Sequence, residues 1–128
     1  MGISGKMRVL LGSGGIATEA RKELYRELVS EHFSDCEEVL FVPYASEDHD
    51  TYTSRMQSFL GPDGPSLVGI HDFDDRASAV NVATGIYVGG GNSFLLIRDL
   101  HEFDLIEPIR DRVLAGVPYL GVSAGSNV

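Results

Sequence analysis

A serine flanked by glycines near the end of the chain is the strongest indication of chemistry in this sequence. The residues are Gly121-Val122-Ser123-Ala124-Gly125, which fit the pattern G-x-S-x-G. This pattern is typical of a nucleophile elbow, a sharp strand-to-helix turn that lifts a serine hydroxyl out of a sheet. Small neighbours are needed because a bulky side chain would clash where the backbone reverses. The same residues would also suit an ordinary glycine-rich turn, so the pattern alone leaves both interpretations open.

A second glycine-rich segment follows an apolar run over residues 86–88. Its sequence is Gly89-Gly90-Gly91-Asn92-Ser93. Consecutive glycines lose much conformational entropy on folding, so we expect them where backbone N–H groups must come close to a ligand oxygen. One of these N–H groups, together with the N–H of Ala124, would form an oxyanion hole. The alternative is a plain loop or an anion-binding turn at the start of the next helix.

A third glycine-rich segment fits a dinucleotide-binding pattern only in part. Gly12-Ser13-Gly14-Gly15-Ile16-Ala17 reads G-x-G-x-x-A after an apolar run. A dinucleotide site also needs an acidic residue where the second strand ends. The second apolar run ends in Phe41-Val42-Pro43-Tyr44, and no acidic residue follows until Glu47. We therefore expect no nucleotide cofactor.

Apolar runs that alternate with helix-period stretches are expected to position these segments. The runs predicted to be strands are residues 8–12, 39–42, 67–70, 86–88 and 117–122. The stretches predicted to be helical are residues 17–29, 52–60, 75–81, 94–100 and 108–115. This alternation predicts an α/β domain with a mainly parallel sheet flanked by helices. In such sheets ligands bind beyond the carboxyl ends of the strands, which is where the glycine-rich segments fall.

Length and charge narrow the class of protein. The chain has 128 residues, which is about one domain; we assign residues 7–128 to it and interpret residues 1–6 as a tag remnant. With 19 acidic and 10 basic residues the net charge is −9, which disfavours nucleic acid as a partner. No apolar run approaches the ~18 residues of a membrane span. The single Cys36 and the absence of a secretory signal predict a cytoplasmic protein.

An acidic cluster and a group of aromatic residues are expected to have structural roles and no part in chemistry. Asp72, Asp74 and Asp75 lack the glycine and the terminal glutamate of a calcium loop, so we expect a solvated loop and no metal. The aromatic residues interpreted as core or as the wall of a cleft are Phe33, Tyr44, Tyr52 and Phe59.

Three segments carry a resemblance to a known family. They are residues 41–45 (FVPYA), 86–94 (IYVGGGNSF) and 108–127 (PIRDRVLAGVPYLGVSAGSN). They resemble peptidase E, the aspartyl dipeptidase family of serine peptidases, whose fold is flavodoxin-like and related to class I glutamine amidotransferases. The resemblance implies Ser123 as the nucleophile, the amides of Gly91 and Ala124 as oxyanion donors, and Gly90 and Asn92 as substrate-binding residues. The implied reaction is hydrolysis of small peptides with an N-terminal aspartate, without metal or organic cofactor.

The sequence departs from the family pattern after the serine. The family's catalytic histidine and its acidic partner lie further along the chain, and no residue up to Val128 matches them, so the likeness is to a C-terminally truncated member. A serine hydroxyl is a weak nucleophile without a positioned base. The four histidines are all upstream, and we expect a structural or solvated role for each; His49 is the least implausible substitute among them. The alternative is a non-catalytic binding module or a paralogue without a general base. We also expect either a homo-oligomer or a further C-terminal fragment.

Overall fold

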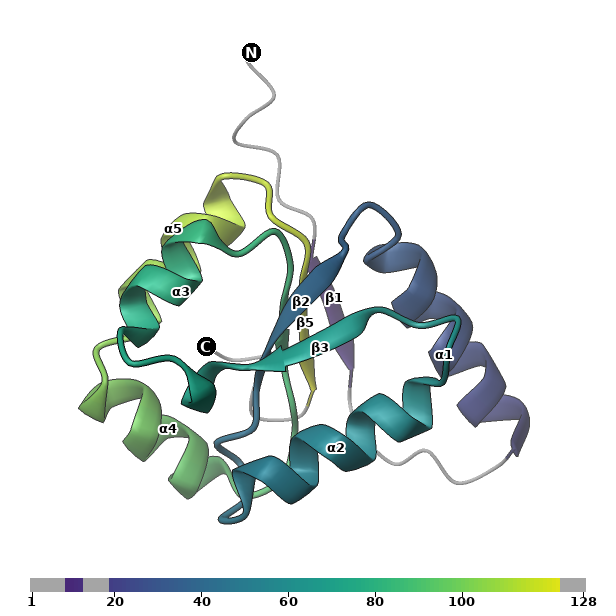
Figure 1. Cartoon of the computed structure of the whole chain (residues 1–128), viewed down its shortest axis with the longest axis horizontal. Helices are drawn as coiled ribbons and strands as arrows, with labels where there is room; N and C mark the ends of the chain where they lie inside the picture. The colour runs from purple at the N-terminus through teal and green to yellow at the C-terminus, as the bar shows by residue number, and fades with distance from the viewer. Residues whose placement is uncertain (1–8, 13–18, 123–128) are drawn as a thin grey trace.

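The computed structural model of the chain describes residues 9–12 and 19–122 (Figure 1). The strands are β1 (Val9–Gly12), β2 (Glu38–Val42), β3 (Ser66–Gly69), β4 (Ile86–Val88) and β5 (Tyr119–Val122). The helices are α1 (Glu19–His32), α2 (His49–Leu60), α3 (Arg76–Val82), α4 (Ser93–Glu102) and α5 (Ile106–Leu114), with a short 3-10 helix, η2 (Ile70–Asp72), after β3. Strands and helices alternate along the chain, as the hydrophobic pattern predicts.

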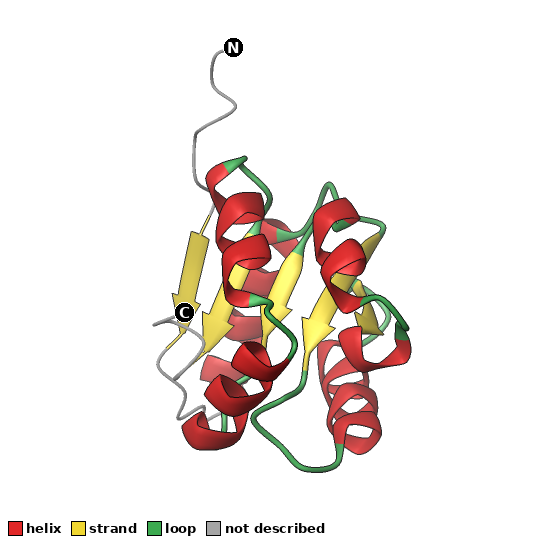
Figure 2. Ribbon diagram, turned by 90° about the vertical axis from the view of Figure 1, so that its left-hand side faces the viewer, coloured by secondary structure: helices red, strands yellow, loops and turns green. Residues whose placement is uncertain are grey.

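Within the described residues the strands form one sheet in the order β1-β5-β4-β2-β3, and every neighbouring pair is parallel. Figure 2 shows the strands running in one direction between layers of helices. This confirms the predicted α/β fold. β5 lies inside the sheet, between β1 and β4, so its backbone is hydrogen-bonded on both sides. The carboxyl ends of β5, β4 and β2 consequently lie next to one another.

Helices cover both faces of the sheet and create two cores. α1 and α2 pack on one face, and α3, α4 and α5 pack on the other (Figure 1). Successive side chains of a strand point to opposite faces. Phe41 and Tyr87 therefore join the core under α1 and α2, whereas Leu40 and Ile86 join the other core. β2 and β4 are thus buried on both faces, which explains why they read as continuous apolar runs.

Side-chain caps determine where three of the helices begin. Asp48, Asp75 and Asn92 each precede a helix and accept hydrogen bonds from backbone N–H groups of its first turn. These bonds satisfy donors that have no acceptor within the helix. α5 begins at Ile106, two residues before the predicted start at Pro108. The proline lies in the first turn, where no N–H is required.

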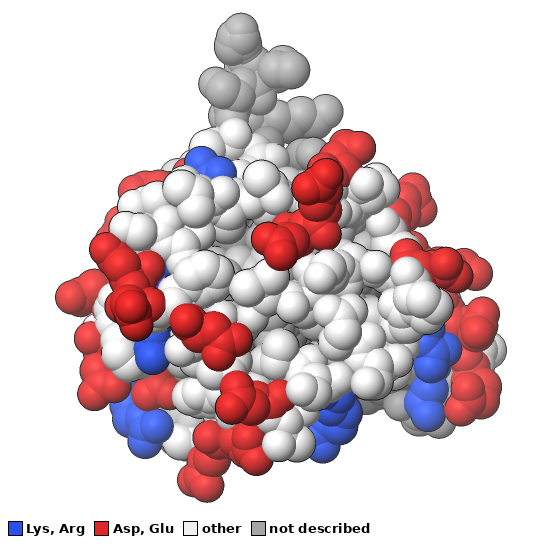
Figure 3. All heavy atoms as spheres, in the orientation of Figure 1, with Lys and Arg blue, Asp and Glu red and all other residues white. Residues whose placement is uncertain are grey.

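Acidic side chains outnumber basic ones on the face of the molecule drawn in Figure 3. On the face drawn in Figure 3, Asp and Glu are spread over most of the rim and Lys and Arg are fewer, as the net charge of −9 requires. In the part of the chain that the structure describes, no helix is both long and apolar enough to cross a membrane.

Replacement of Phe41 by alanine tests the core under α1 and α2. Phe41 is 0% exposed, and its ring meets the rings of Tyr52 and Tyr87 edge-on at centroid distances of 5.2 Å. We expect Phe41→Ala to lower the free energy of unfolding by about 3–5 kcal/mol, because loss of a buried aromatic ring leaves a cavity. Val82 is 77% exposed, so Val82→Ala is the control, with an expected change within about 0.5 kcal/mol. Urea unfolding followed by circular dichroism measures both variants, and equal effects would contradict this packing.

Candidate active site

The topology of the sheet brings together two of the glycine-rich segments. Val88 of β4 pairs with Val42 of β2 on one side and with Gly121 of β5 on the other. Neighbouring strands are about 4.8 Å apart, so the segments that leave their carboxyl ends start side by side. Ligand sites of α/β sheets lie at such ends. Ser123 and Ala124 follow β5 in the sequence but lie outside the described residues, and their roles stay predictions.

Backbone hydrogen bonds fix the segment after β4, residues 89–92, which we call the glycine loop. The N–H of Gly89 donates to the carbonyl of Val42 at 3.1 Å, and the N–H of Asn92 donates to the carbonyl of Ala45 at 2.9 Å. The loop therefore lies along the segment that leaves β2. The N–H of Gly91 donates to no acceptor among the described residues. An unpartnered backbone donor at this place fits an oxyanion hole or an anion site.

The conformation of the loop explains its glycines. Gly91 has a φ of +142°, a region of backbone space that is essentially restricted to glycine. A Cβ at Gly91 would also lie 2.9 Å from the carbonyl oxygen of Ala45. The carbonyl of Gly90 accepts a hydrogen bond of 2.7 Å from the hydroxyl of Tyr52. The glycines thus allow the loop to approach both Ala45 and Tyr52 closely.

Asn92, predicted to bind substrate, has a structural task as well. Its Oδ1 accepts hydrogen bonds from the N–H groups of Phe94 at 2.9 Å and Leu95 at 3.1 Å, which caps α4. The side chain is exposed, and its Nδ2 donates to no described residue. In the side chain of Asn92, Nδ2 is thereby the atom left for a substrate. Because Nδ2 is a donor, the aspartate or peptide group that binds to it would have to offer a hydrogen-bond acceptor.

Three of the histidines, His32, His71 and His101, lie elsewhere in the fold than the carboxyl end of β5. His32 hydrogen-bonds through Nε2 to the carbonyl of Tyr119 at 2.8 Å, which is at the amino end of β5 and so at the opposite end of the sheet. His101 is exposed on the last turn of α4. His71 follows β3, three strand positions from β5, a separation of about 14 Å.

His49, the substitute base suggested by the sequence, begins α2. Its ring packs against Tyr44 with centroids 5.2 Å apart and against His71 with centroids 5.5 Å apart. Burial lowers the pKa of His49, and the nearby His71 lowers it further. These neighbours place the ring toward the β3 side of the sheet. The geometry therefore gives no support to His49 as the base for a serine that follows β5.

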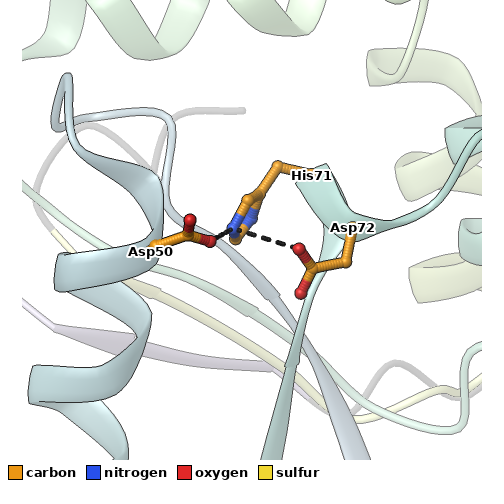
Figure 4. Close-up of side chains that lie close together, drawn as sticks. All are labelled: Asp50, His71 and Asp72. Atoms are coloured by element: carbon orange, nitrogen blue, oxygen red, sulfur yellow. Dashed lines mark hydrogen bonds and ion pairs between the residues drawn. The ribbon is translucent and has the colours of Figure 1, made fainter.

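Asp50, His71 and Asp72 form the other polar cluster at this end of the sheet (Figure 4). The Nε2 atom of His71 lies 2.7 Å from Oδ1 of Asp50 and 3.6 Å from Oδ1 of Asp72. The His71 side chain is only 12% exposed, and it lies over Gly69, where a Cβ would come within 2.3 Å of its ring. Sequence analysis missed this cluster, because Asp50 is distant in sequence and only Asp72 belongs to the acidic stretch.

The other ring nitrogen of His71 decides how this cluster is interpreted. Its Nδ1 atom is buried and has no hydrogen-bond partner. A cation on Nε2 would force the proton onto Nδ1, where a buried N–H would lack an acceptor. A proton on Nε2 is instead shared with Asp50 at hydrogen-bond distance. The donor set therefore fits an Asp–His pair that links α2 to η2 better than it fits a set of metal ligands.

A cavity of about 570 Å³ lies at the other end of the strands. Glu38, Ala79 and Thr84 are among the residues that line it. Glu38 begins β2 and Thr84 precedes β4, so this cavity lies at the amino ends of these strands, whereas the glycine loop follows the carboxyl end of β4. We do not take this cavity as the candidate site despite its size, because the glycine-rich segments follow the carboxyl ends of the strands, where ligands bind in such sheets.

Comparison with known proteins identifies the family of the chain. A family model described as Peptidase family S51 matches residues 8–128. A Drosophila melanogaster protein named probable alpha-aspartyl dipeptidase is 52% identical over 91 residues, which are 70% of this chain and 38% of the relative. Peptidase E of Shewanella denitrificans is 37% identical over 122 residues, which are 94% of this chain and 52% of the relative. The chain thus spans about half, or less, of these relatives' length.

A solved structure shares the fold. The crystal structure of a peptidase from an acI-B1 Actinobacterium superposes with a TM-score of 0.64 at 18% sequence identity. The match covers 98% of this chain and 58% of that one. At this identity the likeness concerns the fold alone.

Alanine at Gly91 should disrupt the glycine loop more than alanine at a glycine that has room. Gly61 also has a positive φ, +77°, but a Cβ there would meet no atom within 4 Å. We expect Gly61→Ala to lower the free energy of unfolding by about 2 kcal/mol through backbone strain alone, because its φ of +77° and ψ of −176° fall in a region that is essentially restricted to glycine. Gly91→Ala adds a clash with Ala45 and should lower it by about 3 kcal/mol. Urea unfolding of both variants makes the comparison, and a Gly91 variant no less stable than the Gly61 variant would contradict the loop conformation.

The lowered pKa of His49 predicts a pH-dependent stability. Its ordinary pKa of 6.5 applies to the unfolded chain, so at pH values between the folded and unfolded pKa the unfolded state binds more protons. Stability then rises with pH. We expect the contribution of His49 to be complete above about pH 6.5 and to be lost as the pH falls through the folded-state pKa.

His49→Gln should remove that contribution, because the glutamine side chain does not titrate. The measurement is the free energy of unfolding of the wild type and of this variant at two pH values, one above about pH 6.5 and one below the folded-state pKa. A wild type that loses no more stability on acidification than the variant would show that His49 is not buried as described.

Proposed function

Because the chain belongs to peptidase family S51, we propose that it acts as a serine-type dipeptidase on small peptides with an N-terminal aspartate. The observation that carries the proposal is the glycine loop, whose Gly91 N–H has no acceptor among the described residues and lies after β4, next to the strand that leads into G-x-S-x-G. The preference for aspartate is supported by the name of the Drosophila melanogaster relative and by the sequence resemblance to the aspartyl dipeptidases.

In the proposed reaction, the Oγ atom of Ser123 attacks the carbonyl carbon of the aspartyl peptide bond. A base takes the hydroxyl proton and returns it to the leaving amine as the C–N bond breaks. Water then hydrolyses the aspartyl ester, which releases aspartate and restores the serine. The N–H groups of Gly91 and Ala124 are proposed to donate to the oxyanion of each tetrahedral intermediate.

Among residues 19–122, no histidine is placed where it could act as the base for Ser123. His32 faces the amino end of β5, and His49 and His71 pack together on the β3 side. We therefore propose that the histidine and acidic residue of the family, which lie beyond the matching part of the sequence, complete the site. In the rival function, a non-catalytic module, the same Gly91 N–H would hold an anionic ligand without turnover.

We also propose a cytoplasmic location and a small peptide as the partner. The sequence has a single cysteine, Cys36, so no disulfide forms within it, which is compatible with a reducing compartment. The acidic surface supports a small substrate over a nucleic acid.

Hydrolysis of aspartyl p-nitroanilide by the protein as its gene encodes it is the direct test. We expect Ser123→Ala to lower kcat/KM by at least about 10⁴-fold, because the nucleophile and its base act as a unit. Ser58→Ala, at an exposed position of α2, is the matched control and should leave the rate unchanged. The asparaginyl substrate, which differs in charge and hardly in size, should react about 100-fold more slowly.

Each alternative outcome identifies a different error. Turnover that survives Ser123→Ala would exclude the serine mechanism. Equal turnover of the asparaginyl substrate would keep the mechanism but remove the specificity for aspartate. Binding of aspartyl peptides without any hydrolysis would favour the binding module.

A further inference from the structure

We propose that Tyr52 is a positioning residue for the oxyanion site, because its hydroxyl fixes the direction in which the Gly91 N–H points. The inference rests on the proposed function of Gly91. Sequence analysis interpreted Tyr52 only as core or cleft wall, since its place in a helix-period stretch is that of an ordinary core residue. The contacts of its hydroxyl assign it this further role.

The first step concerns a single peptide group. The hydroxyl of Tyr52 donates to the carbonyl oxygen of Gly90 at 2.7 Å. That carbonyl and the N–H of Gly91 belong to the same peptide unit, which is planar, with its C=O and N–H pointing in opposite directions. A hydrogen bond that holds the carbonyl on the α2 side therefore turns the Gly91 N–H away from α2.

The second step is that this peptide unit needs a contact to hold its direction. We call the hydrogen bond from Tyr52 to Gly90 the tether. A peptide group rotates through the ψ angle of the residue before it and the φ angle of the residue after it. Glycine permits both signs of φ, so the unit between Gly90 and Gly91 has no steric preference of its own for one direction. The hydrogen bond from Asn92 to Ala45 holds the next peptide unit, Gly91–Asn92, and the bond from Gly89 to Val42 holds the unit two places earlier, Val88–Gly89. Among the described residues, only Tyr52 bonds to the Gly90–Gly91 unit itself.

The third step is that Tyr52 is itself immobilised. Its ring meets the buried ring of Phe41 edge-on, with centroids 5.2 Å apart and planes at 86°. The main chain lies directly over the hydroxyl, because a Cβ at Gly89 would come within 2.5 Å of it. Burial raises the pKa of Tyr52 to about 12, so the hydroxyl stays a donor at neutral pH. A donor held by packing, beneath a peptide unit between two glycines, is the arrangement expected of a positioning residue.

Tyr52→Phe tests the tether, because it removes the donor and keeps the ring. Tyr25→Phe is the matched control, since the Tyr25 hydroxyl is paired with that of Tyr87 in the same aromatic layer and does not bond to the loop. The first readout is the amide resonance of Gly91 in ¹⁵N-labelled protein. We expect Tyr52→Phe to shift or broaden that resonance and Tyr25→Phe to leave it in place.

The second readout is the split between kcat and KM on aspartyl p-nitroanilide. Loss of a whole oxyanion donor lowers kcat by about 10²–10³-fold, so a misdirected donor should lower kcat by about tenfold. KM should change little, because the donor acts mainly on the charge of the transition state. Tyr25→Phe should change neither constant, and thermal melts of both variants check that each is folded.

The outcomes separate this inference from the proposed function. An unchanged Gly91 resonance in Tyr52→Phe overturns the tether, whatever the activity. A changed resonance with kcat unaltered overturns the positioning role and leaves the dipeptidase proposal intact. Absence of hydrolysis by the wild type overturns the proposed function and, with it, the catalytic meaning of the tether. A changed resonance together with a fall in kcat supports the inference.

Discussion

The hydrogen bond from the N–H of Gly89 to the carbonyl of Val42 is the contact on which the candidate site depends. It continues the parallel pairing of β2 with β4 by one residue beyond Val88, the end of the strand. The glycine loop therefore begins in a direction set by the sheet. β4 also pairs with β5, and this second pairing fixes where β5, the strand before Ser123, ends relative to the loop. Slippage of one residue between these strands would turn every side chain to the other face, so the hydrophobic cores protect this register.

The core under α1 and α2 supports the loop as well as the fold. Phe41 and Tyr87 come from the central strands and meet edge-on, and Tyr52 of α2 meets Phe41 in the same way. Of these aromatic residues, Tyr52 reaches furthest toward the site, through its bond to Gly90. The same aromatic rings thus stabilise the core and hold the glycine loop in place. Changes to these rings should affect the position of the loop before they affect secondary structure elsewhere.

The elements and the places of the motifs could be predicted from the sequence, because buried parallel strands read as apolar runs and glycines mark their exits. The prediction of residues 86–88 as a strand agrees with β4, and β5 lies within the run predicted over residues 117–122. The strand order could not be predicted, since the pairing of β5 with β1 joins residues more than a hundred positions apart. α5 begins before Pro108 because a proline is tolerated anywhere in a first turn and does not mark its first residue.

The site was predictable to a smaller extent. The glycine loop was found because repeated glycines are unusual, but its contacts with Ala45 and Tyr52 depend on tertiary structure. The capping role of Asn92 has a local signal, an asparagine directly before a helix, which the functional interpretation overlooked. The Asp50–His71 pair has none, because α2 and η2 meet only in the folded chain. Ser123 and Ala124 lie outside the described residues and rest on the sequence pattern.

The central claim is that the glycine loop and the serine after β5 form one acyl-transfer site. A crystal structure of the protein with a boronic acid analogue of aspartate bound would test it most directly. We predict a covalent bond from boron to Oγ of Ser123, with one boron-bound oxygen about 3 Å from the nitrogen of Gly91. A boronate attached to another residue, or one whose oxygens all face away from the Gly91 N–H, would contradict the claim.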